Sequence, residues 1–159
     1  MEEIVLDSIK FCKGKGAIDI GCGHGEDSLI LAKEGFDVDS LDISENMLND
    51  TKNIFKINNL EVKTIKTNIL NYKTEERYDF VLIKDLLHFL DFGDIFKAIE
   101  KVKEITKIGG VNVIVFFVKD EKEIKLIKEL YSEWDIKIIN EYDYRGKRVF
   151  EICVVNKLT

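Results

Sequence analysis

The chain has 159 residues, of which 45% are hydrophobic and 34% are charged, and its formal net charge is −6. This size and mixture are typical of one globular domain, so we expect residues 1–159 to form a single domain. The negative charge argues against nucleic acid and anionic membranes as partners, because both repel an acidic surface. No apolar run approaches the roughly 20 residues that a membrane-spanning helix needs.

Cysteine usage indicates a reducing compartment. Cys12, Cys22 and Cys153 are odd in number and widely spaced, and the sequence has no C-x-x-C pair. The beginning of the sequence lacks the basic flank, apolar stretch and cleavage site of a signal peptide. We therefore expect a cytoplasmic protein with free thiols. Because the histidines and cysteines are scattered, we expect no metal site.

Strand and helix patterns alternate along most of the chain. Strands are predicted at 16–21, 36–42, 60–66, 78–84 and 111–118. Helices are predicted at 2–11, at 26–35, after Ser44, at 92–106 and at 121–133. Gly35 is expected to end one helix, and Gly109 and Gly110 are expected to stop another. Such alternation predicts an α/β fold in which helices cover both faces of a parallel sheet.

The end of the chain departs from this alternation. Two strand patterns, at 135–144 and 147–156, are separated only by Arg145 and Gly146. So short a connection cannot hold a crossover helix, so the two strands are predicted to pair as an antiparallel hairpin. The predicted organisation is an N-terminal helix, a core at 16–118, and a C-terminal helix with hairpin at 121–156.

The loop after the first predicted strand contains three closely spaced glycines. Gly21, Gly23 and Gly25 form G-x-G-x-G, whereas the dinucleotide fingerprint is G-x-G-x-x-G and needs a glycine where Glu26 stands. A glutamate there also repels a pyrophosphate, which weakens the case for NAD. S-adenosylmethionine (SAM) has no phosphate and carries a sulfonium and an amino group, so Asp19 suits it better.

Asp42 ends the second predicted strand. A carboxylate at this place can accept hydrogen bonds from both hydroxyls of a ribose, and Ile43 beside it offers an apolar face to adenine. Because an acid here serves any adenosine, Asp42 does not discriminate between ligands. The glycine spacing and Asp19 favour SAM.

These motifs resemble those of the class I SAM-dependent methyltransferases along nearly the whole chain. "DIGCGHG" is similar to their glycine loop, "LDIS" to their acidic strand end, "TNIL" to the segment that meets adenine, and "TKIGGVNVIVF" to their turn before strand five. The resemblance implies a Rossmann-like, doubly wound seven-stranded sheet of order 3-2-1-4-5-7-6 with strand seven antiparallel. "EDSLILAKEGFDV" and "ELYSEWDIKIINEYDY" most resemble the tellurite-resistance and thiopurine-type branch.

The resemblance also implies roles for single residues. The methionine part of SAM would lie among the residues of the glycine-loop motif and beside Lys84; the loop residues are Asp19, Gly21, Cys22, Gly23 and Gly25. Asp42 would hold the ribose, while Ile43, Asn68 and the backbone of Ile69 would meet adenine. Asn68 replaces the acid that such families usually have, but an amide oxygen can still accept a hydrogen bond from the adenine amino group.

Two residues after the fourth predicted strand are candidates for catalysis. His88 is either a general base, which its ordinary pKa near 6.5 suits, or a half-buried residue bonded to backbone. Asp85 either orients an acceptor or caps the next helix. The resemblance implies in-line transfer of a methyl group to a small molecule, with S-adenosylhomocysteine (SAH) as product, by a monomer or homodimer. The alternatives are a non-catalytic SAM-binding module within a complex and a protein or RNA methyltransferase.

Overall fold

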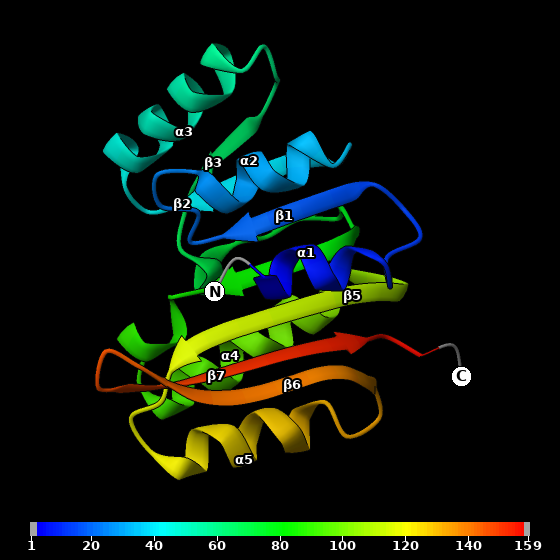
Figure 1. The fold of residues 1–159 in the computed structure, drawn as a ribbon, viewed down its shortest axis with the longest axis vertical. Helices are drawn as coiled ribbons and strands as arrows, with labels where there is room; N and C mark the ends of the chain where they lie inside the picture. The colour runs from blue at the N-terminus through cyan, green and yellow to red at the C-terminus, as the bar shows by residue number, and fades with distance from the viewer. Residues whose placement is uncertain (1–2, 158–159) are drawn as a thin grey trace.

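Seven strands and five helices make up most of the computed structural model, which describes residues 3–157 (Figure 1). The strands are β1 Gly16–Ile20, β2 Asp37–Asp42, β3 Lys63–Lys66, β4 Tyr78–Lys84, β5 Thr106–Phe117, β6 Asp135–Tyr144 and β7 Lys147–Val155. The helices are α1 Glu3–Ile9, α2 Glu26–Lys33, α3 Glu45–Ile57, α4 Phe92–Glu104 and α5 Glu121–Leu130, and two 3₁₀ turns are η1 Ile69–Asn71 and η2 Leu87–Phe89.

The strands form one mixed sheet of order β3-β2-β1-β4-β5-β7-β6. Strands β1 to β5 are parallel, and β7 pairs antiparallel with β5 and with β6. Arg145 and Gly146 both have positive φ angles, 53° and 78°, as a two-residue hairpin turn requires. The predicted strand order and the predicted hairpin are confirmed.

Alternating side chains along the strands build a core on each face of the sheet (Figure 1). Ile18 and Ile20 of β1 and Ile114 of β5 pack in the cluster that contains α4 and α5. Ala17 and Val113, one position out of phase, pack in the cluster with α1, α2 and α3. This period of two is expected of a sheet covered on both faces.

The region around Gly109 and Gly110 differs from the prediction. Helix α4 ends at Glu104, and β5 begins at Thr106 and continues through both glycines. Pairing with β4 shifts register there, since Tyr78 faces Thr106 and Phe80 faces Val111. Gly109 has φ +81°, and a Cβ on Gly110 would lie 2.8 Å from the Lys107 carbonyl oxygen. The glycines therefore permit a bulge within a strand, and the prediction that they stop a helix is wrong.

Other boundaries differ by a few residues. Strand β3 begins at Lys63 instead of 60, and α5 ends at Leu130 instead of 133. Helix α1 covers Glu3–Ile9, while residue 2 of the predicted helix lies outside the described residues. Within residues 3–157 no helix combines the length and hydropathy needed to cross a bilayer.

The parallel strands determine where a site can form. Because β1, β2 and β4 are adjacent and run in the same direction, the segments that follow them meet at one edge of the sheet. Ligands of open α/β sheets bind at this carboxyl edge.

Candidate functional site

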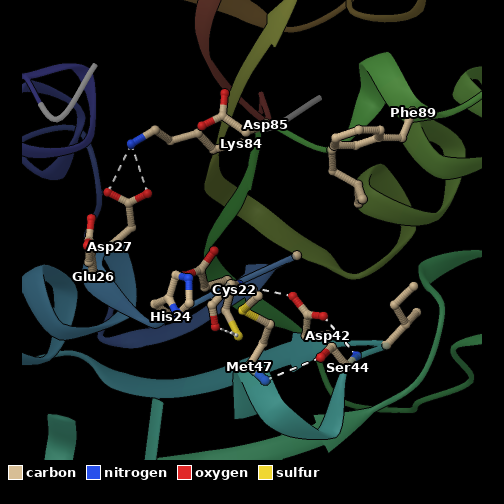
Figure 2. Close-up of a pocket in the computed structure, with 15 residues that line it drawn as sticks. Cys22, His24, Glu26, Asp27, Asp42, Ser44, Met47, Lys84, Asp85 and Phe89 are labelled. Atoms are coloured by element: carbon tan, nitrogen blue, oxygen red, sulfur yellow. Dashed lines mark hydrogen bonds and ion pairs between the residues drawn. The ribbon is translucent and has the colours of Figure 1, made fainter. Parts of the chain in front are cut away.

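Two adjoining cavities lie along the carboxyl edge. The first, of about 470 Å³, is bounded by the glycine loop, the start of α2, the end of β2 and the segment after β4 (Figure 2). The second, of about 270 Å³, is bounded by the end of β2, the segment after β3 and η2. We call them the loop cavity and the η1 cavity. Five residues line both: Gly21, Asp42, Ile43, Leu86 and Phe89.

The glycine loop adopts a backbone that other residues resist. Gly21, Gly23 and Gly25 have φ angles of +74°, +56° and +89°. Gly21 and Gly23 line the loop cavity. Gly25 lies behind the loop against α3, where a Cβ would be 2.7 Å from the Thr51 Oγ1 atom. Gly25 therefore shapes the loop through packing and does not line either cavity.

Asp42 fixes the loop to the end of β2. Its Oδ2 accepts a hydrogen bond from the Gly23 N–H (3.0 Å), and its Oδ1 accepts one from the Ser44 N–H (2.9 Å). Each carboxylate oxygen has two acceptor sites, so both oxygens retain one for a ligand. Asp42 thus holds the loop while it lines both cavities.

Asp19 is a buried acid beneath the loop cavity. Its side chain accepts a hydrogen bond from the Ser28 hydroxyl at 2.7 Å, and the residue is 2% exposed. Burial raises the pKa of Asp19 to about 7, and the Ser28 hydrogen bond limits that rise. A positively charged group in the cavity would favour the ionised form.

A buried ion pair joins β4 to the first turn of α2. Lys84 Nζ lies 2.9 and 3.2 Å from the two carboxylate oxygens of Asp27, and the side chains are only 11% and 16% exposed (Figure 2). Both residues line the loop cavity. Lys84 was predicted at this site, whereas Asp27 was not.

Cys22 lines the same cavity as a protonated thiol. Burial raises its pKa to about 12, and its Sγ lies 3.7 Å from the Thr51 hydroxyl. A thiol that stays protonated at neutral pH is a poor nucleophile. The geometry fits a packing residue.

The η1 cavity contains the adenine-side residues of the prediction. Asn68 caps η1, because its Oδ1 accepts a hydrogen bond from the Leu70 N–H at 3.0 Å. Ile69 is 2% exposed, whereas Ile43 at the rim is 69% exposed. The Thr67 N–H donates to the Asp42 carbonyl oxygen (3.2 Å), which ties this segment to the end of β2.

Asp85 and His88 line different cavities. Asp85 lines the loop cavity with a left-handed backbone, φ +58°, while His88 lines a third cavity of about 340 Å³ beside Phe117 and Lys147. Among the described residues, Asp85 Oδ1 and His88 Nδ1 are buried without a hydrogen-bond partner. Burial raises the pKa of Asp85 and lowers that of His88, so it favours the neutral form of each.

Comparison with known proteins places this chain in a family. The family model described as tellurite resistance protein TehB matches residues 1–143. The chain belongs to the TehB family. It is 32% identical to the probable SAM-dependent methyltransferase TehB of Haemophilus influenzae strain Rd, over 86% of this chain and 52% of that protein. The chain therefore spans about half the length of this curated relative.

Solved structures agree with the TehB assignment. The crystal structure of TehB from Haemophilus influenzae matches 99% of this chain and 63% of that chain with a TM-score of 0.85 at 25% identity. A SAM-bound magnesium protoporphyrin IX methyltransferase from Synechocystis PCC 6803 shares the fold, with a TM-score of 0.81 at 17% identity over 98% of this chain and 76% of that chain. The predicted class I methyltransferase fold and tellurite-resistance branch are confirmed.

Sequence reasoning missed several cavity residues of this TehB-family chain. Asp27 could have been predicted from the sequence, since it is an acid in the first turn after a glycine loop. The sequence does not reveal three other cavity residues, because single apolar residues outside a motif do not show which cavity they line; these are Met47, Leu86 and Phe89.

Proposed function

We propose that this chain binds SAM across the two joined cavities and transfers its methyl group to a small-molecule acceptor. The observation that carries the proposal is the position of Asp42, which lines both cavities and keeps free acceptor sites at the junction. SAM has a polar methionine part and a flat adenine part joined through a ribose. A ribose-binding carboxylate between a cavity lined by many charged side chains and a largely apolar cavity matches that division.

The loop cavity suits the methionine part. SAM is positively charged at its amino group and its sulfonium, and the cavity is rich in carboxylates; these belong to Asp19, Glu26, Asp27, Asp42 and Asp85. Lys84 supplies a cation for the ligand's carboxylate within the same cavity. The backbone of Gly21 and Gly23, together with Cys22, lets the ligand approach closely, and Gly25 supports the loop from behind.

The η1 cavity suits the adenine. Ile43 at the rim provides an apolar face, and Leu86 lines the same cavity. Asn68 and the backbone of Ile69 are proposed to meet the adenine edge. The Asn68 side-chain oxygen already accepts one hydrogen bond from Leu70, so it has one acceptor site left for the adenine amino group.

The protein contributes to this reaction mainly by aligning the acceptor with SAM. SAM supplies an electrophilic methyl carbon, and SAH is the product. The chain's residues hold the acceptor in line with the C–S bond and exclude water, which in well-oriented systems is worth about 7–11 kcal/mol. Where the acceptor must lose a proton, the neutral His88 is the proposed general base, and Asp85, which lines the loop cavity, is proposed to orient the acceptor.

The remaining proposals concern the class of acceptor, the cellular compartment and the oligomeric state. The net charge of −6 disfavours nucleic acid as the acceptor. Cys12, Cys22 and Cys153 are all free, which suits a reducing cytoplasm. We propose a monomer or homodimer that acts on a small thiol, selenium, tellurium or arsenic compound.

Turnover of isotopically labelled SAM tests the proposal. The chain is incubated with labelled SAM and a panel of thiol, selenite, tellurite and arsenite acceptors, and SAH formation is followed. We expect SAH to accumulate with at least one acceptor and to fall at least tenfold in Asp42→Asn. Binding of SAM without turnover on any acceptor would instead favour the cofactor-binding module.

A further inference from the structure

Phe89 is a large aromatic side chain that the folded chain leaves exposed at the mouth of the site. It is 77% exposed, although its neighbour Leu87 is completely buried. The η2 turn holds it there, because the Phe89 N–H donates to the Leu86 carbonyl oxygen (3.0 Å) and the His88 ring lies 4.3 Å from the Phe89 ring, centroid to centroid. An ordered turn therefore holds the Phe89 side chain in its exposed position.

The position of Phe89 coincides with the junction of the two cavities. Phe89 is the one aromatic residue among the five, all within the described chain, that line both cavities. Figure 2 shows it across the view from Glu26 and Asp27, so it lies on the other side of the loop cavity from these acids. A ligand that spans both cavities must pass its central atoms through this junction.

In SAM the ribose and the neighbouring sulfonium lie between the two parts, and the charged group of this link is the sulfonium. It links the methionine chain to the 5′ carbon of the ribose, and it carries a positive charge that SAH lacks. An aromatic face attracts a cation through its quadrupole, whereas a neutral thioether gains only dispersion from the same face. A phenylalanine at this junction can therefore distinguish the sulfonium of the ligand from the thioether of its product.

We propose that Phe89 is a specificity-determining residue that binds the sulfonium of SAM through a cation–π contact and so favours SAM over SAH. The inference rests on the proposed function. The acids of the loop cavity attract the amino group, which SAM and SAH share, as well as the sulfonium, whereas the cation–π contact of Phe89 responds to the sulfonium alone. Phe89 acts on the group that differs between the two ligands.

Isothermal titration of SAM and SAH into the whole chain tests the proposal, with Phe89→Leu as the main variant. Leucine keeps an apolar side chain and removes the quadrupole. We expect the Kd of SAM to rise about fivefold, which corresponds to about 1 kcal/mol, and the Kd of SAH to change by less than twofold. Phe89→Tyr keeps an aromatic face and should keep the wild-type ratio of the two constants.

The matched control is Phe96→Leu, which changes a 46% exposed phenylalanine of α4 that lines neither cavity. It should leave both constants unchanged. If Phe89→Leu weakens SAM and SAH by the same factor, or affects neither, the cation–π contact is refuted while the proposed function stands. If the wild-type chain binds neither ligand, the proposed function fails and this inference fails with it.

Discussion

Asp42 performs two tasks, and the substitution Asp42→Asn affects both of them. Its two oxygens accept hydrogen bonds from Gly23 and Ser44 and are proposed to accept two more from a ribose. Asp42→Asn keeps the shape but replaces one oxygen with a donor. Since a hydrogen bond to a charged group contributes about 1.5–3 kcal/mol, we expect the Kd values of SAM and SAH to rise about 10–100-fold, measured by titration.

Asp37→Asn is the control for this change. Asp37 is exposed at the opposite end of β2, so neither Kd should respond to its substitution. Equal affinities for the wild type and Asp42→Asn would show that the ribose is held elsewhere.

The raised pKa of the buried Asp19 leads us to predict that the stability of the folded chain depends on pH. Burial raises its pKa from 3.8 to about 7, so between these values the folded chain holds a proton that the unfolded chain has lost. Stability from this group is therefore present at low pH and is lost as the pH rises towards 7. Asp19→Asn removes the ionisation and keeps an acceptor for the Ser28 hydroxyl.

We expect the free energy of unfolding of Asp19→Asn, relative to wild type, to increase by about 2–3 kcal/mol between pH 5 and pH 8, because only the wild type loses stability over this range. Urea unfolding at both pH values without ligand measures this difference. A difference that stays constant with pH would mean that Asp19 ionises normally in the folded chain.

At the scale of elements, the loop between β1 and α2 depends on Gly25. Gly25 and Gly35 have nearly equal φ angles, +89° and +90°, but a Cβ would lie 2.7–2.9 Å from Thr51 at Gly25 and would meet no atom within 4 Å at Gly35. Both alanine variants carry the strain of a left-handed backbone, about 1–2 kcal/mol. Only Gly25→Ala also forces α2 and α3 apart.

Urea unfolding should therefore show Gly25→Ala to be less stable than Gly35→Ala by about 1–3 kcal/mol, the usual range for overpacking. Because Gly25 shapes the glycine loop, SAM affinity should also fall in that variant and stay unchanged in Gly35→Ala. Equal losses of stability would mean that Thr51 moves aside without cost.

The elements themselves were largely predictable, for physical reasons. Alternation of apolar residues and short connections determine strand type and hairpin pairing, as in the Arg145–Gly146 turn. The exception is Gly109–Gly110, because paired glycines stop a helix or permit a bulge, and which occurs depends on the pairing with β4. Turns as short as η2 cannot be predicted in this way, because three residues are too few to show a hydrophobic periodicity.

At the scale of the whole molecule, the site was predictable where it follows strand ends. Asp19, Asp42 and Lys84 lie in or directly after the central strands, so topology alone brings them together. Phe89 could not be found this way, because its position depends on the η2 turn. The roles of the site residues, and the organisation of residues 1–159 as one domain, stay predictions.

The measurement that tests the account most directly is thermal unfolding of the chain with SAM, SAH, NAD and ATP, each added separately. A ligand at about 100 times its Kd adds about 2.7 kcal/mol of stability, which should raise the Tm by about 5–10 °C for a chain of this size. We expect SAM and SAH to raise the Tm and NAD and ATP to leave it unchanged. A rise with NAD alone, or with none of the four ligands, would contradict the account.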